Sequence, residues 1–210
     1  MTQIIQIHNQ SFTLHASGSL FWQEKSALLI SDVHLGKVSH FRKHGAAVPQ
    51  EAIHANFDLM NEVVEFFNPK HIYFLGDLFH SHINNEWNLF ENWISKSKVK
   101  IILINGNHDI ISPLKYEALG IKVLDELREK NFLLTHHPEE REGSFNFCGH
   151  IHPAVKIRGS GKQSLRLPCF FKSPNQLILP AFGEFTGSFT LKPTKKDQVF
   201  AIAEGMIIKI

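Results

Sequence analysis

Histidine, aspartate and asparagine residues gather at five points along the 210-residue chain. The five clusters are Asp32-Val33-His34, Gly76-Asp77, Gly106-Asn107-His108-Asp109, His136-His137 and Gly149-His150-Ile151-His152. The chain contains 14 histidines, and imidazole is the commonest side-chain ligand for metals in proteins. Imidazole, carboxylate and amide donors suit Mn, Fe, Zn or Ni. The clusters therefore predict a site for divalent metal ions.

An apolar run that is typical of a buried strand precedes each cluster. These runs are Ala27–Ile30, Ile72–Leu75, Ile101–Ile104, Phe132–Leu134 and Phe145–Cys148. Loops at the carboxyl ends of strands are where α/β folds place their ligands. Residues two apart in an extended segment point the same way, so Asp32 with His34, and His150 with His152, are each predicted to face one pocket.

Taken singly, each of these residues has a simpler interpretation. A lone histidine after a strand is more often a capping or surface group, and Gly76-Asp77 by itself is only a turn. Five polar clusters, each directly after an apolar run, are not expected by chance. The joint pattern favours the metal site over five independent turns.

The elements around these clusters predict a layered α/β fold. Ile4–Ile7 and Ser11–His15 are expected as strands, and Gln50–Phe67 and Trp87–Ile94 as helices. From Ala154 onward the chain is expected to form short strands with Gly and Pro turns. Alternating strands and helices followed by strands predict two mixed sheets, packed face to face with helices outside, in a single domain spanning residues 1–210.

The composition limits the function classes. With 43% hydrophobic residues and 18 phenylalanines the chain is expected to fold, and a net charge of +2 is too small to indicate nucleic-acid binding by itself. Cys148 and Cys169 lie in apolar surroundings, which favours a reduced, cytoplasmic protein, with one disulfide as the alternative. Met1–Ile7 does not resemble a signal peptide, and no stretch of sequence is apolar enough to cross a bilayer, so no membrane association is expected.

The order of the clusters resembles the signature of the calcineurin-like metallophosphoesterase superfamily, which is D-x-H, G-D, G-N-H-[DE], H and G-H-x-H. The resemblance implies a four-layer α/β/β/α sandwich with two divalent cations, manganese first among them, at one edge of the sheets. It implies Asp32, His34 and His152 as ligands of one cation, Asn107, His136 and His150 as ligands of the other, and Asp77 as the bridge. His136 is preferred over His137 because it directly follows the apolar run.

The same resemblance implies a mechanism of phosphoester hydrolysis. Two cations would activate water and clamp the substrate phosphate. His108 would act on the leaving group, with Asp109 orienting its imidazole; the alternative is that His108 is a further ligand. For His80, His82 and His137 a role toward the substrate and a plain packing or surface role both stay open.

Further segments resemble the DNA-ligase-associated metallophosphoesterases, called PdeM. They are Leu35-Gly36-Lys37, Phe41-Arg42, Gly76-Asp77-Leu78, Arg166-Leu167-Pro168-Cys169-Phe170 and the stretch from Leu179 to Gly187. This resemblance implies a DNA endonuclease or phosphodiesterase acting in DNA repair, functionally associated with a DNA ligase and a helicase. Lys37 and Arg42 are predicted to bind substrate phosphates, and the alternative is a solvated basic loop.

Two other function classes are weighed against a DNA enzyme. One is a hydrolase of a small phosphodiester or phosphomonoester such as a nucleotide. The other is a non-catalytic metal-binding or scaffold protein, which the complete set of expected ligands and the presence of His108 disfavour.

Overall fold

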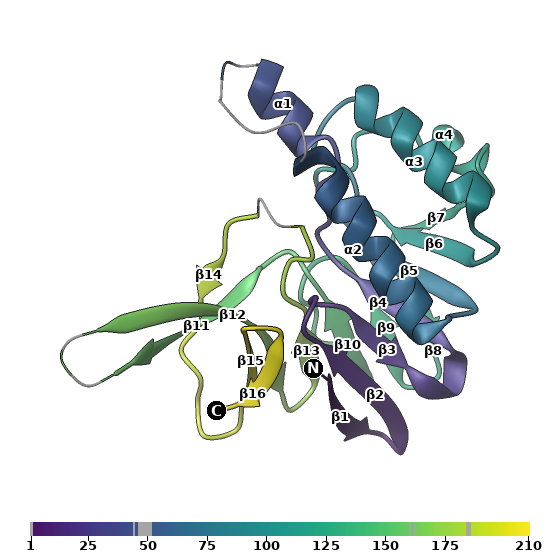
Figure 1. Ribbon diagram of the computed structural model, residues 1–210. Helices are drawn as coiled ribbons and strands as arrows, with labels where there is room; N and C mark the ends of the chain where they lie inside the picture. Colours follow the sequence, from purple (N-terminus) through teal and green to yellow (C-terminus); the bar gives the residue numbers. More distant parts are fainter. Residues whose placement is uncertain (1, 44, 46–51, 160, 162, 184–185) are drawn as a thin grey trace.

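Two mixed β-sheets packed face to face form the body of the protein (Figure 1). The computed structural model describes residues 2–43, 45, 52–159, 161, 163–183 and 186–210. This architecture confirms the expected fold class. Within the described ranges, no helix has both the length and the apolar character needed to span a membrane.

The first sheet follows the chain in order. Its strands are β1 (Thr2–Ile7), β2 (Gln10–His15), β3 (Leu20–Trp22), β4 (Ala27–Ile30), β5 (His71–Leu75), β6 (Lys100–Ile104) and β7 (Lys122–Leu124). Neighbouring strands from β1 to β4 are antiparallel, and those from β4 to β7 are parallel. The carboxyl ends of β4, β5 and β6 therefore meet at one edge of the sheet.

The second sheet contains the later strands in a different order. They are β8 (Leu127–Glu129), β9 (Phe132–Leu134), β10 (Phe145–Cys148), β11 (Pro153–Arg158), β12 (Ser164–Ser173), β13 (Gln176–Ile178), β14 (Phe189–Thr190), β15 (Gln198–Ala203) and β16 (Met206–Lys209). The order is β14-β11-β12-β13-β10-β9-β8, with β15 pairing with β12 and β16 with β15. Strand β10 runs parallel to both β9 and β13, so these three strands also end at a common edge.

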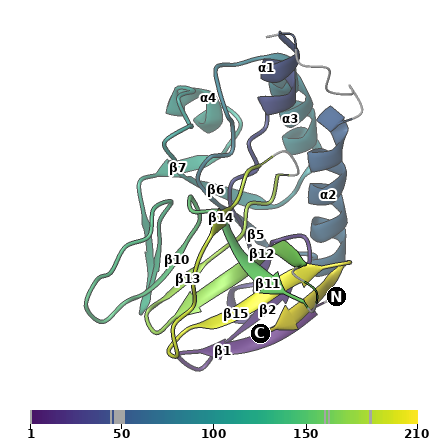
Figure 2. The same cartoon turned by 90° about the vertical axis from the view of Figure 1, so that its left-hand side faces the viewer.

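The α-helices gather on one side of the molecule in both views (Figures 1 and 2). They are α1 (Lys37–Lys43), α2 (Ala52–Phe67), α3 (Asn85–Lys96) and α4 (Pro113–Glu117), and a short 3-10 helix spans Gln23–Lys25. Among the residues described, no α-helix covers the outer face of the second sheet. A small apolar cluster that includes Cys148 and Cys169 lies there instead. In the described residues, helices therefore cover the first sheet only, whereas the sequence predicts helices outside both sheets.

Alternation along the strands explains the two main cores. In β4, Leu28 and Ile30 face the helices, whereas Ala27 and Leu29 face the second sheet. The core between the sheets is rich in aromatic rings, and the centroids of Phe12 and Phe147 lie 4.8 Å apart. Close packing on both faces fixes the strands, and with them the loops at their carboxyl ends.

The sequence predicts the buried strands well and the short helices poorly. Strands β4, β9 and β10 have the predicted bounds, and α2 ends at Phe67 as predicted, while its predicted start at Gln50 lies outside the described residues. Helix α3 begins before the predicted Trp87 because the side chain of Asn84 caps it, accepting from the Glu86 amide at 2.9 Å. The apolar patterns do not predict helices α1 and α4.

Candidate metal centre

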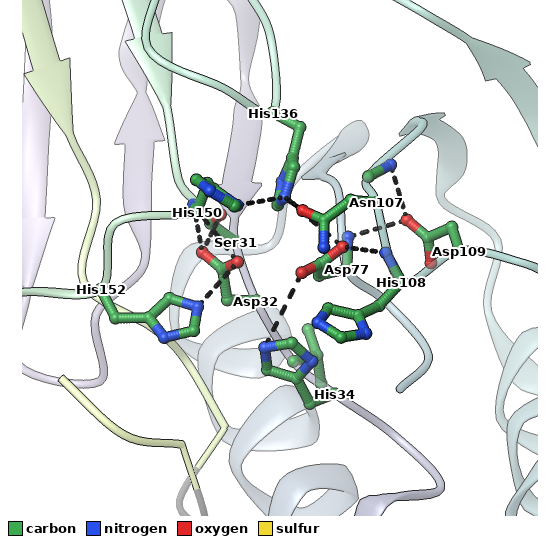
Figure 3. Close-up of polar contacts among 12 residues, drawn as sticks. Ser31, Asp32, His34, Asp77, Asn107, His108, Asp109, His136, His150 and His152 are labelled. Atoms are coloured by element: carbon green, nitrogen blue, oxygen red, sulfur yellow. Dashed lines mark hydrogen bonds and ion pairs between the residues drawn. The ribbon is translucent and has the colours of Figure 1, made fainter. Parts of the chain in front are cut away.

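The seven predicted metal ligands lie together where the parallel strands of both sheets end (Figure 3). Asp32 and His34 follow β4, Asp77 follows β5, Asn107 follows β6, His136 follows β9, and His150 and His152 follow β10. Four of them, Asp32, His34, Asp77 and His136, are at most 4% exposed. Asn107 is exposed and His150 and His152 are half-buried, so the group opens to solvent on one side.

One group of donor atoms belongs to Asp32, His34 and His152, whose ligand atoms all lie within 4.8 Å of one another. His152 Nε2 lies 3.1 Å from Asp32 Oδ1. Both ring nitrogens of His34 are buried and have no hydrogen-bond partner among the described atoms. Burial lowers the pKa of His34 to about 3, against the opposite effect of the Asp32 and Asp77 charges. A neutral, buried imidazole with an unused lone pair fits a metal ligand.

A second group surrounds Nε2 of His136. Asn107 Oδ1 lies 3.0 Å, His150 Nδ1 3.2 Å and Asp77 Oδ1 3.4 Å from this nitrogen. One ring nitrogen makes only one hydrogen bond at a time, so a single proton cannot satisfy three polar neighbours. A cation among these four donor atoms would satisfy all of them, and the residues therefore fit a metal.

Asp77 lies between the two groups. Its Oδ1 faces His136, and its Oδ2 lies 4.0 Å from His34 Nε2. Burial acts against the charge of this carboxylate, but the hydrogen bond and charge of His136 and the amide of His108 outweigh it and lower its pKa to about 2. Asp77 is therefore ionised at neutral pH, and its two oxygens face opposite groups, as a bridging ligand requires.

Two backbone carbonyls orient the imidazoles. His136 Nδ1 lies 2.9 Å from the Leu75 carbonyl, and His152 Nδ1 lies 3.1 Å from the Gly187 carbonyl. A ring that donates from Nδ1 keeps the lone pair on Nε2, which faces the carboxylates here. The contact with Leu75 also favours His136 over His137, which is exposed, although the ring of His137 lies 4.1 Å from that of His150.

The backbone at five predicted ligands is left-handed, and the predicted extended geometry of the D-x-H and H-x-H segments is wrong. The φ angles are 56° at Asp32, 53° at His34, 51° at Asp77, 63° at His150 and 49° at His152. Such conformations cost on the order of 1–3 kcal/mol each and persist only where the surrounding structure imposes them. Both members of each pair still reach the same site, but through sharp turns at the strand ends.

Two glycines allow the loops to approach each other closely. A Cβ atom on Gly106 would collide with the backbone nitrogen and Oδ1 of Asp77, and one on Gly149 would collide with Ser31 and Asp32. The glycines of the G-N-H-D and G-H-x-H clusters are therefore needed because carboxylates of neighbouring loops lie against the backbone at these points.

Polar contacts around Asp32 are not apparent from the sequence. Ser31 Oγ donates to Asp32 Oδ2 at 2.5 Å, and the His150 amide donates to the same oxygen at 3.0 Å. The amide of Gly183 donates to the Asp32 carbonyl at 3.1 Å. The distinctive stretch from Leu179 to Gly187, of which residues 184–185 lie outside the described part, therefore supports the first group through its backbone.

Asp109 does not have the partners expected for orienting His108. It is 8% exposed, and its carboxylate accepts from the backbone amides of Asp77 at 2.7 Å, Gly106 at 2.9 Å and Phe79 at 3.1 Å. Burial raises its pKa to about 6, against the lowering effect of these three amides. In Figure 3 its contacts go to the backbone and none joins it to the imidazole of His108. Asp109 thus fixes the loop that carries Asp77.

His108 extends toward the metal ligands. Its backbone amide donates to Asp77 Oδ1 at 2.8 Å, and its ring centroid lies 5.5 Å from that of His34. The imidazole is half-buried, at the open side of the site. This placement of the His108 imidazole is compatible with the predicted role of His108 toward the leaving group.

Lys37 and Arg42 occupy different environments on helix α1. Lys37 is half-buried, and its Nζ lies 6.0 Å from the ring centroid of Phe41. Burial lowers the pKa of its ammonium, against the opposing effect of the Asp77 charge. Arg42 lies five residues later, about 140° around a helix of 3.6 residues per turn. It lines a separate pocket with residues such as Ile53 and Leu89, and none of the seven predicted ligands lines that pocket. Lys37 is near enough to the metal centre for the Asp77 charge to act on it, whereas Arg42 lines the separate pocket.

Two mixed sheets present carboxylate, imidazole and amide donors at a shared edge, as a site for divalent metals requires. The family model of the calcineurin-like phosphoesterases matches residues 26–157, and the chain belongs to this family. The chain is therefore a metal-dependent hydrolase of phosphoric esters, with divalent metal ions as its cofactors. No sequence match was found among curated proteins.

A comparison with solved structures covers more of the chain than the family model does. The chain resembles the nuclease MPE of Pseudomonas putida, with a TM-score of 0.83, 27% identity and 100% of both chains covered. It also matches a protein of unknown function from Aquifex aeolicus at 17% identity, covering 60% of this chain and 78% of that one, with a TM-score of 0.42. The second likeness is too weak to carry an argument, whereas the first extends over the whole chain.

The unsatisfied imidazole of His34 leads to a prediction about stability. Because both of its nitrogens are buried without partners among the described atoms, His34→Phe should leave the metal-free protein as stable as the wild type or more stable. The same change should abolish most of the rise in melting temperature on adding Mn²⁺, since a metal ligand is removed. Thermal unfolding with and without Mn²⁺ measures both effects.

The matched control is His71→Phe. His71 also has a buried Nδ1 without a partner in the described structure, but it begins β5, at the opposite end from the site. Its replacement should leave the metal-induced shift unchanged. A full metal-induced shift in His34→Phe would contradict the assignment of His34 as a ligand.

Proposed function

We propose that this protein is a two-metal phosphodiesterase that cleaves DNA. The observation that supports the proposal is the crowding of donor atoms on both sides of Asp77. Asp32, His34 and His152 form one close group, and the two carboxylate oxygens of Asp77 lie 4.0 Å from His34 Nε2 and 3.4 Å from His136 Nε2. Asp32, His34 and His152 would hold one cation, Asn107, His136 and His150 the other, and Asp77 both. When bound, the pair of cations supplies Lewis-acid activation of water and neutralisation of the phosphate charge.

The residues of the chain have separate tasks in this reaction. The substrate phosphate would lie at the open side of the site, where Asn107 is exposed and His108 is half-buried. Hydrolysis forms one P–O bond to water and breaks the bond to one ester oxygen. A protonated His108 would donate its proton to the departing oxygen, which otherwise leaves as a strongly basic alkoxide.

The donor set supports a choice of metal. It consists of nitrogen and oxygen atoms, and both cysteines are buried on the far face of the second sheet. Imidazole, carboxylate and amide donors without a thiolate suit Mn, Fe, Zn or Ni, and we place manganese first because the family resemblance implies it.

The nuclease resemblance supports DNA as the substrate. The Pseudomonas putida protein is called a nuclease and covers the whole of this chain. The open site and the half-buried Lys37, three residues after His34, suit a polymer with phosphates next to the one that is cleaved. The segments that resemble the DNA-ligase-associated metallophosphoesterases lead us to propose the same branch for this chain, with a role in DNA repair in the cytoplasm alongside a ligase and a helicase.

The test is substrate preference with Mn²⁺-loaded protein. Bis(p-nitrophenyl) phosphate should be hydrolysed faster than the monoester p-nitrophenyl phosphate, and supercoiled plasmid or single-stranded DNA should be cut at low salt. A panel of nucleotides serves as the comparison. Rapid hydrolysis of small diesters or nucleotides with intact DNA would replace the proposal by a small-molecule phosphoesterase.

Lys37 provides a prediction about neighbouring phosphates. Lys37→Ala should reduce DNA cleavage roughly tenfold while changing the hydrolysis of bis(p-nitrophenyl) phosphate little, because the small diester has no neighbouring phosphate. The dependence of log K on log salt for DNA should flatten by about 0.7–0.9, since the variant neutralises one phosphate fewer. Cleavage rates and DNA binding over a salt series measure the change.

Arg42→Ala is the matched comparison, because Arg42 lies on the same helix but around its other side. It should affect DNA cleavage less than Lys37→Ala. Equal losses on DNA and on the small diester in Lys37→Ala would instead place Lys37 at the cleaved phosphate.

A further inference from the structure

His80 is a histidine next to the metal centre to which the proposed reaction gives no task. It lies in the loop after β5, three residues beyond Asp77, and is half-buried. Its backbone amide donates to the Leu35 carbonyl at 2.9 Å, beside an isolated bridge between Leu35 and Phe79. The position of His80 is therefore tied to the loops that carry His34 and Asp77.

The ring of His80 packs against that of His108. Their centroids lie 4.9 Å apart with an angle of 30° between the planes, while His34 meets His80 edge-on at 5.5 Å and 78°. On its other side His80 approaches helix α1, with centroid distances of 5.8 Å to His40 and 6.4 Å to Phe41. His80 thus fills the space between α1 and His108.

The imidazole of His108 packs against other rings. Within the described part of the chain its ring makes no hydrogen bond, and Asp109 is engaged with three backbone amides. An unrestrained imidazole rotates about χ1 and χ2, and a misplaced catalytic group reduces the rate even where its chemistry is unchanged. The packing surface for the His108 ring is formed by His80 on one face and the edge of His34.

We propose that His80 is a positioning residue that holds the His108 imidazole toward the leaving oxygen through ring packing. The proposal rests on the proposed function in so far as His108 acts on the leaving group. The ring surface of His80, rather than a hydrogen bond from it, would hold His108 in place, because the buried Nδ1 of His80 has no hydrogen-bond partner among the described atoms. A phenylalanine in place of His80 should therefore keep the function, whereas an alanine should not.

The kinetic test compares two substrates with different leaving groups. His80→Ala should lower the turnover of dithymidine phosphate, whose leaving alcohol is poor, roughly 10–100-fold, and should affect bis(p-nitrophenyl) phosphate much less. His80→Phe should retain most of the activity on both. In a His108→Ala background, His80→Ala should add little further loss, since it acts through His108. His82→Ala, on an exposed residue of the same loop, is the control and should match the wild type.

A structural test is independent of activity. In crystal structures of the variants, the His108 ring should occupy more than one rotamer in His80→Ala and a single rotamer in His80→Phe. Loss of activity in His80→Phe equal to that in His80→Ala, or an unchanged His108 ring in His80→Ala, overturns the proposal. Wild-type protein that cleaves no diester overturns the proposed function instead, and the rotamer comparison still decides the role of His80.

Discussion

The structure depends on a cluster of closely spaced oxygen and nitrogen atoms, several of them buried, that cannot all satisfy one another. Three polar atoms lie within 3.4 Å of His136 Nε2, and His34 has two buried nitrogens without partners in the described structure. Burying such atoms costs free energy unless a cation or hydrogen bonds compensate. The left-handed backbone at five of the seven predicted metal ligands adds to that cost. The tightly packed cores on both faces of the first sheet offset it and hold the loops in place.

The arrangement of the two sheets explains why the predicted metal ligands come together. Parallel strands β4, β5 and β6 in one sheet, and β9 and β10 in the other, end at a common edge, so residues separated by more than a hundred positions meet there. The amide of His150 on Asp32 and the imidazole of His136 on Asp77 join the sheets directly. The apolar core between the sheets sets the distance across which these contacts form. Mutations deep in that core are therefore expected to act on the site without touching it.

Local sequence patterns predict the strands and the candidate ligands because both are local properties. An apolar run such as Phe145–Cys148 is buried on both faces of the sheet. The polar cluster that follows it in the sequence therefore lies where the strand ends, at the edge of the sheet. Helix α1 could not be predicted in this way, because the buried carboxylate of Glu86 accepts from Gly36 and Ser39 at its first turn, and Glu86 lies about fifty residues away. The role of Asp109 was also beyond local reasoning, since its partners are backbone amides of other loops. Backbone carbonyls such as those of Leu75 and Gly187 have no sequence signal at all.

The central claim is that these side chains hold two cations that share Asp77, and metal content tests it most directly. Chelator-treated protein is reloaded with Mn²⁺, freed of excess metal and measured by elemental analysis, and the positions are located by anomalous scattering from crystals. The account predicts two manganese ions per chain on either side of Asp77, with Asp77→Asn losing much of the occupancy. One ion per chain at saturation, with undiminished hydrolysis of diesters, would contradict it.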